Sequence, residues 1–395
     1  MSGRTGNSLR LCMALVCFWF TAQGVRAAEN AVTSGVAERA PYMQNLTTDG
    51  VTVMWRTADA QPSFVMTRPC GGNDSVPFSS SVPVRYHEIK LSGLKPASCY
   101  SYSVEFGTAT LGGGSFTTMP AAKISTFTFA VWGDSQHWPQ RFGKIASGIM
   151  AVKPAFAVAV GDYEGNGSVA AQWEEQLFVP GRQLLANVPV FFTVGNHDYG
   201  FKGEDGDYAP DSPGLKNFTD SFRNPAGNRT YYSFDYGNSH FIVLDAIVGR
   251  TFSTFGVVPG TAQYDWLVKD LESARSFSNV FVFLHAPPYS VCWDKDYYDG
   301  EPAVREHLVP LFEKYGVRAV FSGHSHAYER GAYNGVGYIV TGGGGGTLDD
   351  VVHKKWKQIQ VHSFVHHFMK VSVEGDFVVL EAISPEGKVF DKFKL

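Results

Sequence analysis

Two histidines separated by one residue, His324 and His326, lie in the stretch Ser322-Gly323-His324-Ser325-His326. The apolar run before them, residues 318–321, predicts a buried strand that ends at this stretch. Side chains spaced i, i+2 at a strand end point in the same direction, and neutral imidazole is a common metal ligand. One such pair is a weak sign of a metal site, so its meaning depends on ligand-type residues elsewhere in the chain.

Four other predicted strand ends also carry side chains that can bind metal: Asp134, Asp162, Asn196 and His285. Each of them alone has an ordinary reading, because Gly-Asp after a strand is commonly a turn or a cap. It is improbable that all of them fall at strand ends of one region by chance. A single metal rarely needs this many ligands, whereas two metals about 3.5 Å apart, bridged by a carboxylate, would use them all. Mixed nitrogen and oxygen ligands favour Fe, Zn or Mn.

From residue 125 onward, apolar strands alternate with helices, which is typical of an α/β fold. Such folds bind ligands beyond the carboxyl ends of their strands, so we expect the site at the carboxyl edge of a central sheet. Gly342–Gly346 predicts a close backbone approach near the site. The loop 199–228 either covers the site and selects the substrate or is a plain surface loop. The predicted strands are 126–131, 155–160, 188–194, 231–234, 240–245, 280–284, 317–321, 368–373 and 377–383, and the predicted helices are 140–152, 170–178, 263–275 and 303–315.

Residues 28–120 show a different pattern, with short alternating strands separated by Asn, Gly, Ser and Pro. Strands of this length and spacing predict a β-sandwich. The segment carries no cluster of residues that would do chemistry, so we interpret it as an accessory domain. The predicted catalytic domain then spans residues 121–395.

The N-terminal residues 1–27 have the pattern of a signal peptide: a basic start, an apolar run over residues 11–22, and Ala27 at the expected cleavage site. The alternative is an uncleaved anchor. A secreted protein can form disulfides, so Cys70 and Cys99 could pair, although the sequence leaves this open, and Cys292 is expected to be a partly buried free thiol. We predict an extracellular, periplasmic or lysosome-like location. The chain has 395 residues and a net charge of −4, which does not favour nucleic-acid binding. No membrane contact is expected beyond the signal peptide, and the sequence leaves the oligomeric state open.

Five blocks in this order resemble the calcineurin-like metallophosphoesterase superfamily: Gly133-Asp134, Gly161-Asp162, Gly195-Asn196-His197-Asp198, Val282-Phe283-Leu284-His285 and Gly323-His324-Ser325-His326. Two further segments, residues 327–330 and residues 41–55, resemble purple acid phosphatases in particular. The resemblance implies an αβ-sandwich metallophosphoesterase domain preceded by a small fibronectin type III-like β-sandwich. It also implies hydrolysis of phosphoesters, in which a metal-bound hydroxide attacks phosphorus in line.

The resemblance assigns a role to each of these residues. One metal would be held by Asp134, Asp162 and His326. The other would be held by Asp162, Asn196, His285 and His324, with Asp162 as the bridging ligand. His197 resembles the family histidine that contacts the phosphate and protonates the leaving group.

The sequence departs from the family at the first metal. Purple acid phosphatases have a tyrosine three residues after the bridging Asp, where this chain has Gly165. Most other members have a His two residues after the first Asp, where this chain has Gln136. Three replacements for the missing ligand are open. Gln136 could bind through its amide oxygen, or Tyr163 or His137 could bind after a shift of the loop. Alternatively, a water molecule completes the site and Gln136 forms a hydrogen bond with it. The loop 286–289 also lacks the histidines that plant enzymes place there.

We therefore expect a secreted binuclear-metal phosphohydrolase that acts on phosphate monoesters of small molecules. A phosphodiesterase or nucleotide hydrolase is the alternative, because the same metal pair serves both reactions. A third hypothesis is a secreted binding protein whose first metal site has degraded. It depends on the departures at Gln136 and Gly165 alone.

Overall fold

The computed structural model describes residues 37–200, 212–227, 230–247, 256–293 and 298–395. The predicted signal peptide lies outside these residues, as does part of the predicted loop 199–228. Within the described ranges, no helix combines the length and the apolar character that a membrane span requires.

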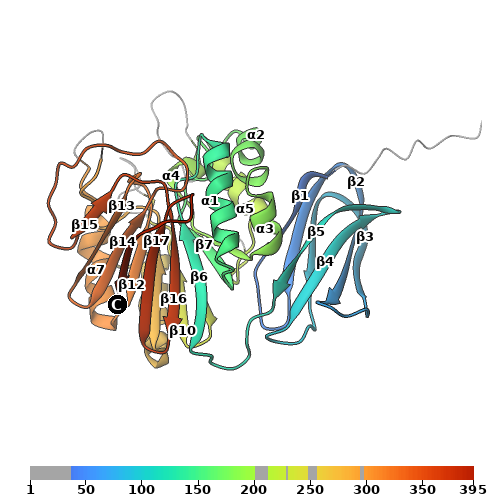
Figure 1. Cartoon of the computed structure of the whole chain (residues 1–395), viewed down its shortest axis with the longest axis horizontal. Helices are drawn as coiled ribbons and strands as arrows, with labels where there is room; N and C mark the ends of the chain where they lie inside the picture. The colour runs from blue at the N-terminus through green and yellow to red at the C-terminus, as the bar shows by residue number, and fades with distance from the viewer. Residues whose placement is uncertain (1–36, 201–211, 228–229, 248–255, 294–297) are drawn as a thin grey trace, which may run out of the picture. The chain divides into compact units, whose positions relative to one another are not determined.

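Two β-sheets form the centre of the predicted catalytic region (Figure 1). Both sheets contain apolar strands that are buried along nearly their whole length, because each sheet is covered on both faces. In the six-stranded sheet, β6 (Thr126–Trp132), β7 (Phe156–Ala159) and β8 (Val190–Phe192) run parallel, and β16 (Phe368–Glu374), β17 (Phe377–Ile383) and β18 (Val389–Lys394) are antiparallel. The seven-stranded sheet has the order β15 (Val361–Ser363), β13 (Tyr328–Tyr333), β14 (Val336–Thr341), β12 (Ala319–Ser322), β11 (Asn279–Phe283), β10 (Ser239–Val243) and β9 (Tyr232–Tyr236).

Aromatic rings fill the space between the two sheets. Phe129 of β6 lies 5.5 Å from Phe156 of β7, centroid to centroid. It also lies 5.3 Å from both Phe241 of β10 and Phe281 of β11, edge to face. Such contacts add about 0.5–1.5 kcal/mol each beyond the burial of area. This aromatic core fixes the spacing of the two sheets, and therefore the distance between the strand ends that carry the predicted ligands.

Helices cover the outer faces of both sheets. This four-layer arrangement confirms the predicted αβ-sandwich, but the prediction of one central sheet was wrong, because the strands divide between two. On the six-stranded sheet lie α1 (Pro139–Ala151), α2 (Ala170–Gln172), η1 (Trp173–Phe178) and α3 (Arg182–Asn187), followed by α4 (Asn196–Tyr199) and α5 (Pro213–Ser221). On the seven-stranded sheet lie α6 (Ala262–Ser273), η2 (Ala274–Ser276), η3 (Val304–Leu308) and α7 (Val309–Tyr315).

The N-terminal region is all-β, as predicted, and its strands fold into a sandwich. The first half of the long strand β2 pairs with β1 and β3, and its second half pairs with β3 and β4. The sheet thus folds over on itself around Met43, Val53, Val65 and Phe116, all of which are buried. The strands are β1 (Ala37–Gln44), β2 (Val51–Pro69), β3 (Val76–Leu91), β4 (Cys99–Phe106) and β5 (Ala109–Thr117).

The structure pairs the two cysteines that the sequence left as a possible disulfide, and it leaves the third described cysteine free, as predicted. Cys70 and Cys99 form a disulfide with a Cα–Cα distance of 5.4 Å, which ties the end of β2 to the start of β4. Cys292 is a buried free thiol. Burial raises the pKa of this thiol, and the nearby Glu329 raises it further, so the thiol is kept protonated and unreactive.

Polar contacts join the β-sandwich to the helices of the catalytic region. The Tyr102 hydroxyl donates to the carbonyl oxygen of Ala186 at 3.1 Å, and the Tyr42 hydroxyl donates to that of Ser221 at 2.7 Å. The Arg39 guanidinium is 6 % exposed and donates to Glu174 at 2.6 and 2.8 Å. The boundary at residues 120 and 121 remains a prediction.

Replacing Arg39 by methionine is expected to lower the free energy of unfolding by about 2–3 kcal/mol, because Glu174 loses a buried partner. Arg56 still lies 3.3 Å from Glu174 and limits the loss. Arg85→Met is the matched control: Arg85 is 52 % exposed beside Glu38, so the control should cost at most about 1 kcal/mol. Urea denaturation of both variants tests this, and equal losses would contradict it.

A second stability prediction concerns pH. His240 on β10 lies between Asp235 and Asp270, with its ring nitrogens 2.6 and 2.9 Å from their carboxylates. Burial alone would lower the pKa of His240, but the two carboxylates raise it from 6.5 to about 9. The stabilisation is therefore complete below pH 6.5 and is lost as the pH rises through 9. The stability difference between the wild type and His240→Gln, on the order of 3 kcal/mol, should shrink over this window. A constant difference in urea midpoints from pH 6 to 10 would contradict the assignment.

Candidate metal centre

The six ligands predicted from the sequence meet at one edge of the two sheets. Three come from the six-stranded sheet, where Asp134 follows β6, Asp162 follows β7 and Asn196 follows β8. The other three come from the seven-stranded sheet: His285 follows β11, and His324 and His326 follow β12. The site is therefore built jointly by both sheets, and its geometry depends on how they pack.

One group of donor atoms gathers around His285. Its Nε2 atom lies 3.2 Å from Asp162 Oδ2 and 2.9 Å from Asn196 Oδ1. The Nδ1 atom of His324 lies 2.8 Å from the same Asn196 oxygen. Asp162, His285 and His324 each offer a donor atom within 4.8 Å of the others, which is the spacing of ligands around one ion. This group corresponds to the second metal predicted above.

A second group of donor atoms lies around His326. Its Nε2 atom is 3.5 Å from Asp134 Oδ1 and 3.1 Å from the side-chain amide nitrogen of Gln136. The Oε1 atom of Gln136 is buried without a hydrogen-bond partner among the described residues. A buried amide oxygen without a partner is costly, and coordination of a metal would satisfy it. This group corresponds to the first metal predicted above, and Gln136 stays a candidate for the position that the sequence left open.

The structure contradicts Tyr163 as a ligand. Its hydroxyl points into the core, where it lies 2.6 Å from the carbonyl oxygen of Thr193 and 3.0 Å from that of Ala159. Tyr163 is fully buried. The Tyr163 side chain packs in the core under the turn that follows β7, and its hydroxyl does not reach the metal-binding donor atoms. Sequence proximity to Asp162 was misleading because the chain turns between the two side chains.

Three of the candidate ligands have a strained backbone. Asp134 and Asp162 both have φ of 59°, and His324 has φ of 69°. This left-handed conformation costs on the order of 1 kcal/mol or more for a residue other than glycine. This conformation directs each of the three side chains from the end of its strand toward the other candidate ligands. Strain of this kind is typical of sites at which the position of a side chain matters for function.

The glycines that directly precede Asn196 and His324 have no side chain, and the carboxylates of other candidate ligands occupy the space where a Cβ atom would be. A Cβ atom on Gly195 would stand 2.2 Å from Asp162 Oδ1, and one on Gly323 would stand 2.3 Å from Asp134 Oδ2. Both distances are well inside van der Waals contact. The Gly-Asn and Gly-His pairs in the sequence therefore have a steric reason: each glycine lets a carboxylate of another loop approach the backbone. The predicted close approach of Gly342–Gly346 is also confirmed, since a Cβ on Gly342 would lie 3.1 Å from Asp134 Oδ2.

The electrostatics of the cluster favour cations. Burial opposes the charge of Asp162, but the neighbouring histidines, His285 first, bring its pKa below the ordinary value. Burial lowers the pKa of His285, yet the carboxylates of Asp162 and Asp134 raise it to about 9. Burial and His285 lower the pKa of His324 to about 3. The negative field that holds a proton on His285 would equally hold a metal ion, and His324 presents a neutral imidazole, the form that ligates metal.

Backbone carbonyls orient two of the imidazoles. The Nδ1 atom of His285 lies 2.7 Å from the Val160 carbonyl oxygen, and that of His326 lies 2.6 Å from the Thr347 carbonyl oxygen. Because a carbonyl only accepts, Nδ1 carries the proton in both rings. The Nε2 atom of each ring is therefore the one that would offer a lone pair to a metal ion, once His285 has released its second proton. This is the usual arrangement of histidines that ligate metal.

His197 lies at the entrance of the cluster. Its Nδ1 atom donates to the carbonyl oxygen of Gly165 at 2.7 Å, and its backbone N–H donates to Asp162 Oδ1 at 2.9 Å. Its Nε2 atom lies 3.9 Å from Asp162 Oδ2, and the side chain is 22 % exposed. The ring thus faces both the donor atoms and solvent, which suits a residue that passes a proton to a leaving group.

Three acidic residues support the site, although none of them was predicted to do so. The Asp198 carboxylate accepts the backbone N–H groups of Asp162, Tyr163 and Gly195, so it ties the ends of β7 and β8 together. Burial raises its pKa to about 7. Asp349 accepts the backbone N–H of His326 at 2.8 Å. Glu329 accepts from residues 290–292 and holds the loop beside His324. Asp198 and Glu329 stand within the quoted motifs, whereas no sequence signal marked Asp349.

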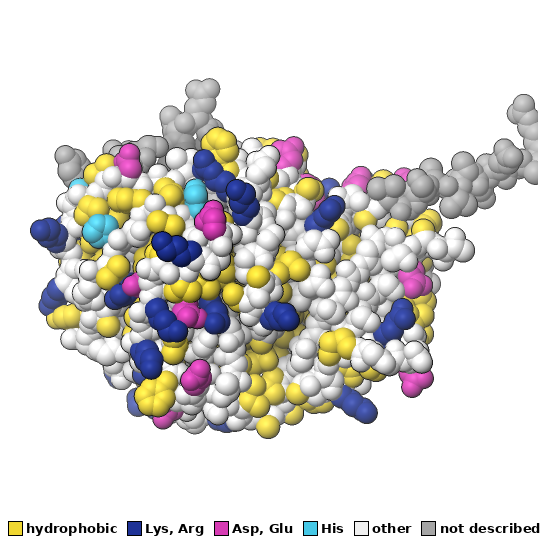
Figure 2. All heavy atoms as spheres, in the orientation of Figure 1, with side chains coloured by type: hydrophobic (Ala, Val, Ile, Leu, Met, Phe, Trp, Pro, Cys, Tyr) yellow, Lys and Arg dark blue, Asp and Glu magenta, His cyan; other side chains and the backbone are white. Residues whose placement is uncertain are grey.

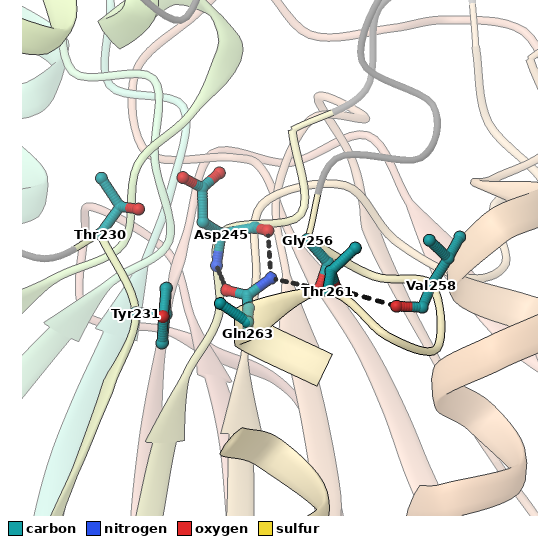
Figure 3. A pocket seen from close by; sticks show the side chains of 8 residues that line it. Thr230, Tyr231, Asp245, Gly256, Val258, Thr261 and Gln263 are labelled. Carbon is teal, nitrogen blue, oxygen red and sulfur yellow. Dashed lines mark hydrogen bonds between the residues drawn. The ribbon is translucent and has the colours of Figure 1, made fainter. Parts of the chain in front are cut away.

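A cavity of about 460 Å³ lies beyond the end of β10, away from the candidate ligands (Figure 3). The Gln263 side chain crosses it and forms hydrogen bonds with both backbone groups of Asp245, each at 2.8 Å. The Asp245 carboxylate accepts from the Tyr199 hydroxyl at 2.6 Å. These polar groups bond to one another, so the described lining gives no sign of a ligand in this cavity.

Comparison with known proteins agrees with this geometry. The family model described as calcineurin-like phosphoesterase matches residues 127–328, just over half of the chain. Purple acid phosphatase 15 of Arabidopsis thaliana is 29 % identical over 297 residues, which cover 66 % of this chain and 53 % of that protein. Serine/threonine-protein phosphatase CPPED1 of Danio rerio is 29 % identical over 210 residues, which cover 51 % of this chain and 63 % of that protein. This chain thus spans about half to two thirds of the length of these curated relatives.

A solved structure shows the same fold. The purple acid phosphatase from yellow lupin seeds superposes with a TM-score of 0.77 at 22 % sequence identity, covering 91 % of this chain and 75 % of that one. The fold, the order of the five motifs and the family match all agree. This chain belongs to the calcineurin-like phosphoesterase family, whose members use binuclear metal centres, and within that family it resembles the purple acid phosphatases.

Proposed function

We propose that this protein is a binuclear-metal phosphohydrolase that removes phosphate from small phosphate monoesters. The observation that carries the proposal is the convergence of three imidazoles, two carboxylates and an amide oxygen where the ends of the two sheets meet, with His197 at the entrance. Both relatives described above carry the name phosphatase, which favours monoesters over diesters.

The residues present fit two metal ions. The donor set, the neutral imidazole of His324 and the unpartnered oxygen of Gln136 are what mixed-ligand sites require. Asp134, Asp162, His326 and Gln136 would hold the first ion, and Asp162, Asn196, His285 and His324 the second. When bound, such a pair neutralises phosphate oxygens and supplies a nucleophile at neutral pH. Fe, Zn and Mn all suit this donor set, and a relative is named an Fe(3+)-Zn(2+) purple acid phosphatase.

The protein's own side chains perform the remaining tasks. Gly165 fixes the His197 ring through Nδ1, so Nε2 is the atom that holds the mobile proton. A protonated Nε2 donates to the leaving alkoxide oxygen as the phosphorus–oxygen bond breaks, which removes the need to expel an unstable anion. Asp198 holds the loops of Asp162 and His197 in fixed positions relative to each other, because its carboxylate accepts backbone N–H groups after both β7 and β8.

Replacing Gln136 by leucine tests the first metal site. We expect the affinity for one of two metals to fall about 10- to 100-fold, because leucine keeps the volume but offers no donor atom. Metal content after dialysis, measured by plasma mass spectrometry, should drop from two ions toward one per chain. If both ions remain, water completes the first site and Gln136 lies beside it.

We also propose that the protein works in an oxidising, extracytoplasmic compartment. The disulfide between Cys70 and Cys99 supports this, since such bonds persist mainly in secreted proteins. The partner is a phosphorylated small molecule and not nucleic acid. Lys and Arg side chains are interspersed with Asp and Glu over the face shown in Figure 2, and the net charge is −4. Nucleic-acid binding would favour a basic surface.

The test is an assay of 4-nitrophenyl phosphate beside bis(4-nitrophenyl) phosphate, across pH and with added Fe, Zn or Mn. We expect the monoester to be turned over faster by at least tenfold. Preference for the diester would assign the protein to phosphodiesterases. No turnover of either ester with two metals bound would leave a metal-containing binding protein, and no turnover with fewer than two metals would favour a degraded first site.

A further inference from the structure

The loop after β6 places a second histidine beside His197. His137 is exposed and has φ of 70°, the same strained region that the candidate ligands occupy. Its backbone N–H donates to the Gln176 side-chain oxygen at 2.6 Å, which holds the strained turn in place. Hydrogen bonds of its ring are absent from the described part of the chain. An exposed imidazole held in a strained position, with no bond of its own, is an observation that calls for a function.

Gly165 brings the two histidine rings together. Its carbonyl oxygen accepts from His197, while its α-carbon faces the edge of the His137 ring. A Cβ atom on Gly165 would stand 2.4 Å from His137 Cε1 and 2.7 Å from His137 Nδ1. Gln176 accepts the backbone N–H of Gly165 as well, at 3.0 Å, so one side chain fixes both loops. The absence of a side chain at residue 165 is therefore what allows His137 to lie there.

The two rings are perpendicular, with centroids 5.8 Å apart. His197 directs its Nε2 atom toward Asp162. A phosphate group bound at the candidate metal ligands would therefore lie close to the rings of both His197 and His137. We propose that His137 is a substrate-binding residue, whose ring N–H donates to a phosphate oxygen of the bound monoester. The inference depends on the proposed function, because it assigns a second phosphate contact to the same site. The proposal also explains why residue 165 is a glycine, because a larger side chain there would displace the His137 ring.

Substitution of His137 by asparagine is the first test. Asparagine tolerates positive φ, so the loop keeps its conformation while the imidazole is lost. We expect KM for 4-nitrophenyl phosphate and the inhibition constant of inorganic phosphate to rise about tenfold together, while kcat changes less than about threefold, because a contact made equally in ground and transition states is removed. The control is His362→Asn, at an exposed side chain of strand β15, which should change neither constant.

A double-mutant cycle tests the geometry. Gly165→Ala should raise KM about as much as His137→Asn does, because the new methyl group displaces the His137 ring. In a His137→Gly background, which has no ring to displace, Gly165→Ala should have no further effect on KM. Additive effects of the two substitutions would overturn the role of Gly165 in placing His137.

The outcomes separate this inference from the proposed function. Calorimetric titration of the metal-loaded protein with inorganic phosphate needs no turnover. If the wild type hydrolyses the monoester but His137→Asn keeps its KM and phosphate affinity within twofold, the inference is overturned and the proposed function stands. The inference is also overturned, and the proposed function still stands, if His137→Asn lowers kcat but leaves KM unchanged. If the wild type hydrolyses nothing, the proposed function fails, and weaker phosphate binding by His137→Asn would still support the inference.

Discussion

Replacement of Asp162 by asparagine is expected to reduce kcat/KM for the monoester by at least about 1000-fold, or about 4 kcal/mol of transition-state stabilisation. The Asp162 carboxylate acts electrostatically on histidines of both groups of donor atoms, His285 and His326. Its Oδ2 atom lies 3.2 Å from His285 Nε2 and 3.9 Å from His197 Nε2. Asparagine has the same shape but no charge, so both metals would lose their shared anionic ligand. Metal content should fall from two ions to one or fewer per chain.

The fold should survive this change. The Asp162 Oδ1 atom accepts the His197 backbone N–H at 2.9 Å, and an asparagine oxygen can accept the same bond. Circular dichroism and thermal unfolding check this point. Asp376→Asn, in the exposed turn between β16 and β17, is the matched control and should retain full activity and metal content. If Asp162→Asn keeps two ions and activity within tenfold of the wild type, Asp162 is not the bridging ligand.

The six candidate ligands could be predicted from the sequence because each follows an apolar strand, and within each sheet the strands that carry them are parallel and end at the same edge. The packing of one sheet on the other, which joins the two halves of the site, could not be predicted. The glycines before the ligands were also informative, although their reason is steric: Gly195 and Gly323 make room for carboxylates of other loops. What could not be predicted depends on long-range packing. Asp349 supports His326 across 23 residues of chain, and His137 lies over Gly165 only because the two loops meet.

The predicted secondary structure failed for similar reasons. Strands β13, β14, β15 and β18 were not predicted, because their pattern does not alternate with helices. Strands β9 to β12 were predicted, but their separation into a second sheet depends on which strands pair. Helix α5 lies in a stretch predicted to be loop. Its start has a recognisable signal, since Ser212 is at the N-cap and Pro213 is at the first helical position. The described part of that stretch packs against the loop beside the site, where Asn217 donates to the Gly167 carbonyl oxygen. Whether the stretch selects the substrate stays a prediction.

The second large effect is expected for His197→Asn. This substitution removes the proton donor at the entrance while leaving every candidate ligand in place. For an alkyl phosphate, kcat should fall by about 100- to 1000-fold, because an alkoxide is a poor leaving group without general acid catalysis. For 4-nitrophenyl phosphate the loss should be at least tenfold smaller, since nitrophenolate leaves as a stable anion. Metal content should remain at two ions per chain.

The comparison of the two substrates separates two roles for His197. A proton donor makes the loss of kcat depend on the leaving group, whereas a residue that only binds phosphate would lower kcat/KM alike for both substrates, through KM. The hydrogen bond from Nδ1 to Gly165 and the orientation of Nε2 toward Asp162 favour the proton donor, because they leave one nitrogen to exchange its proton beside the reacting oxygen. Equal losses for glycerol phosphate and 4-nitrophenyl phosphate, with metals retained, would exclude acid catalysis by His197 and would leave it as a phosphate contact like the one proposed for His137.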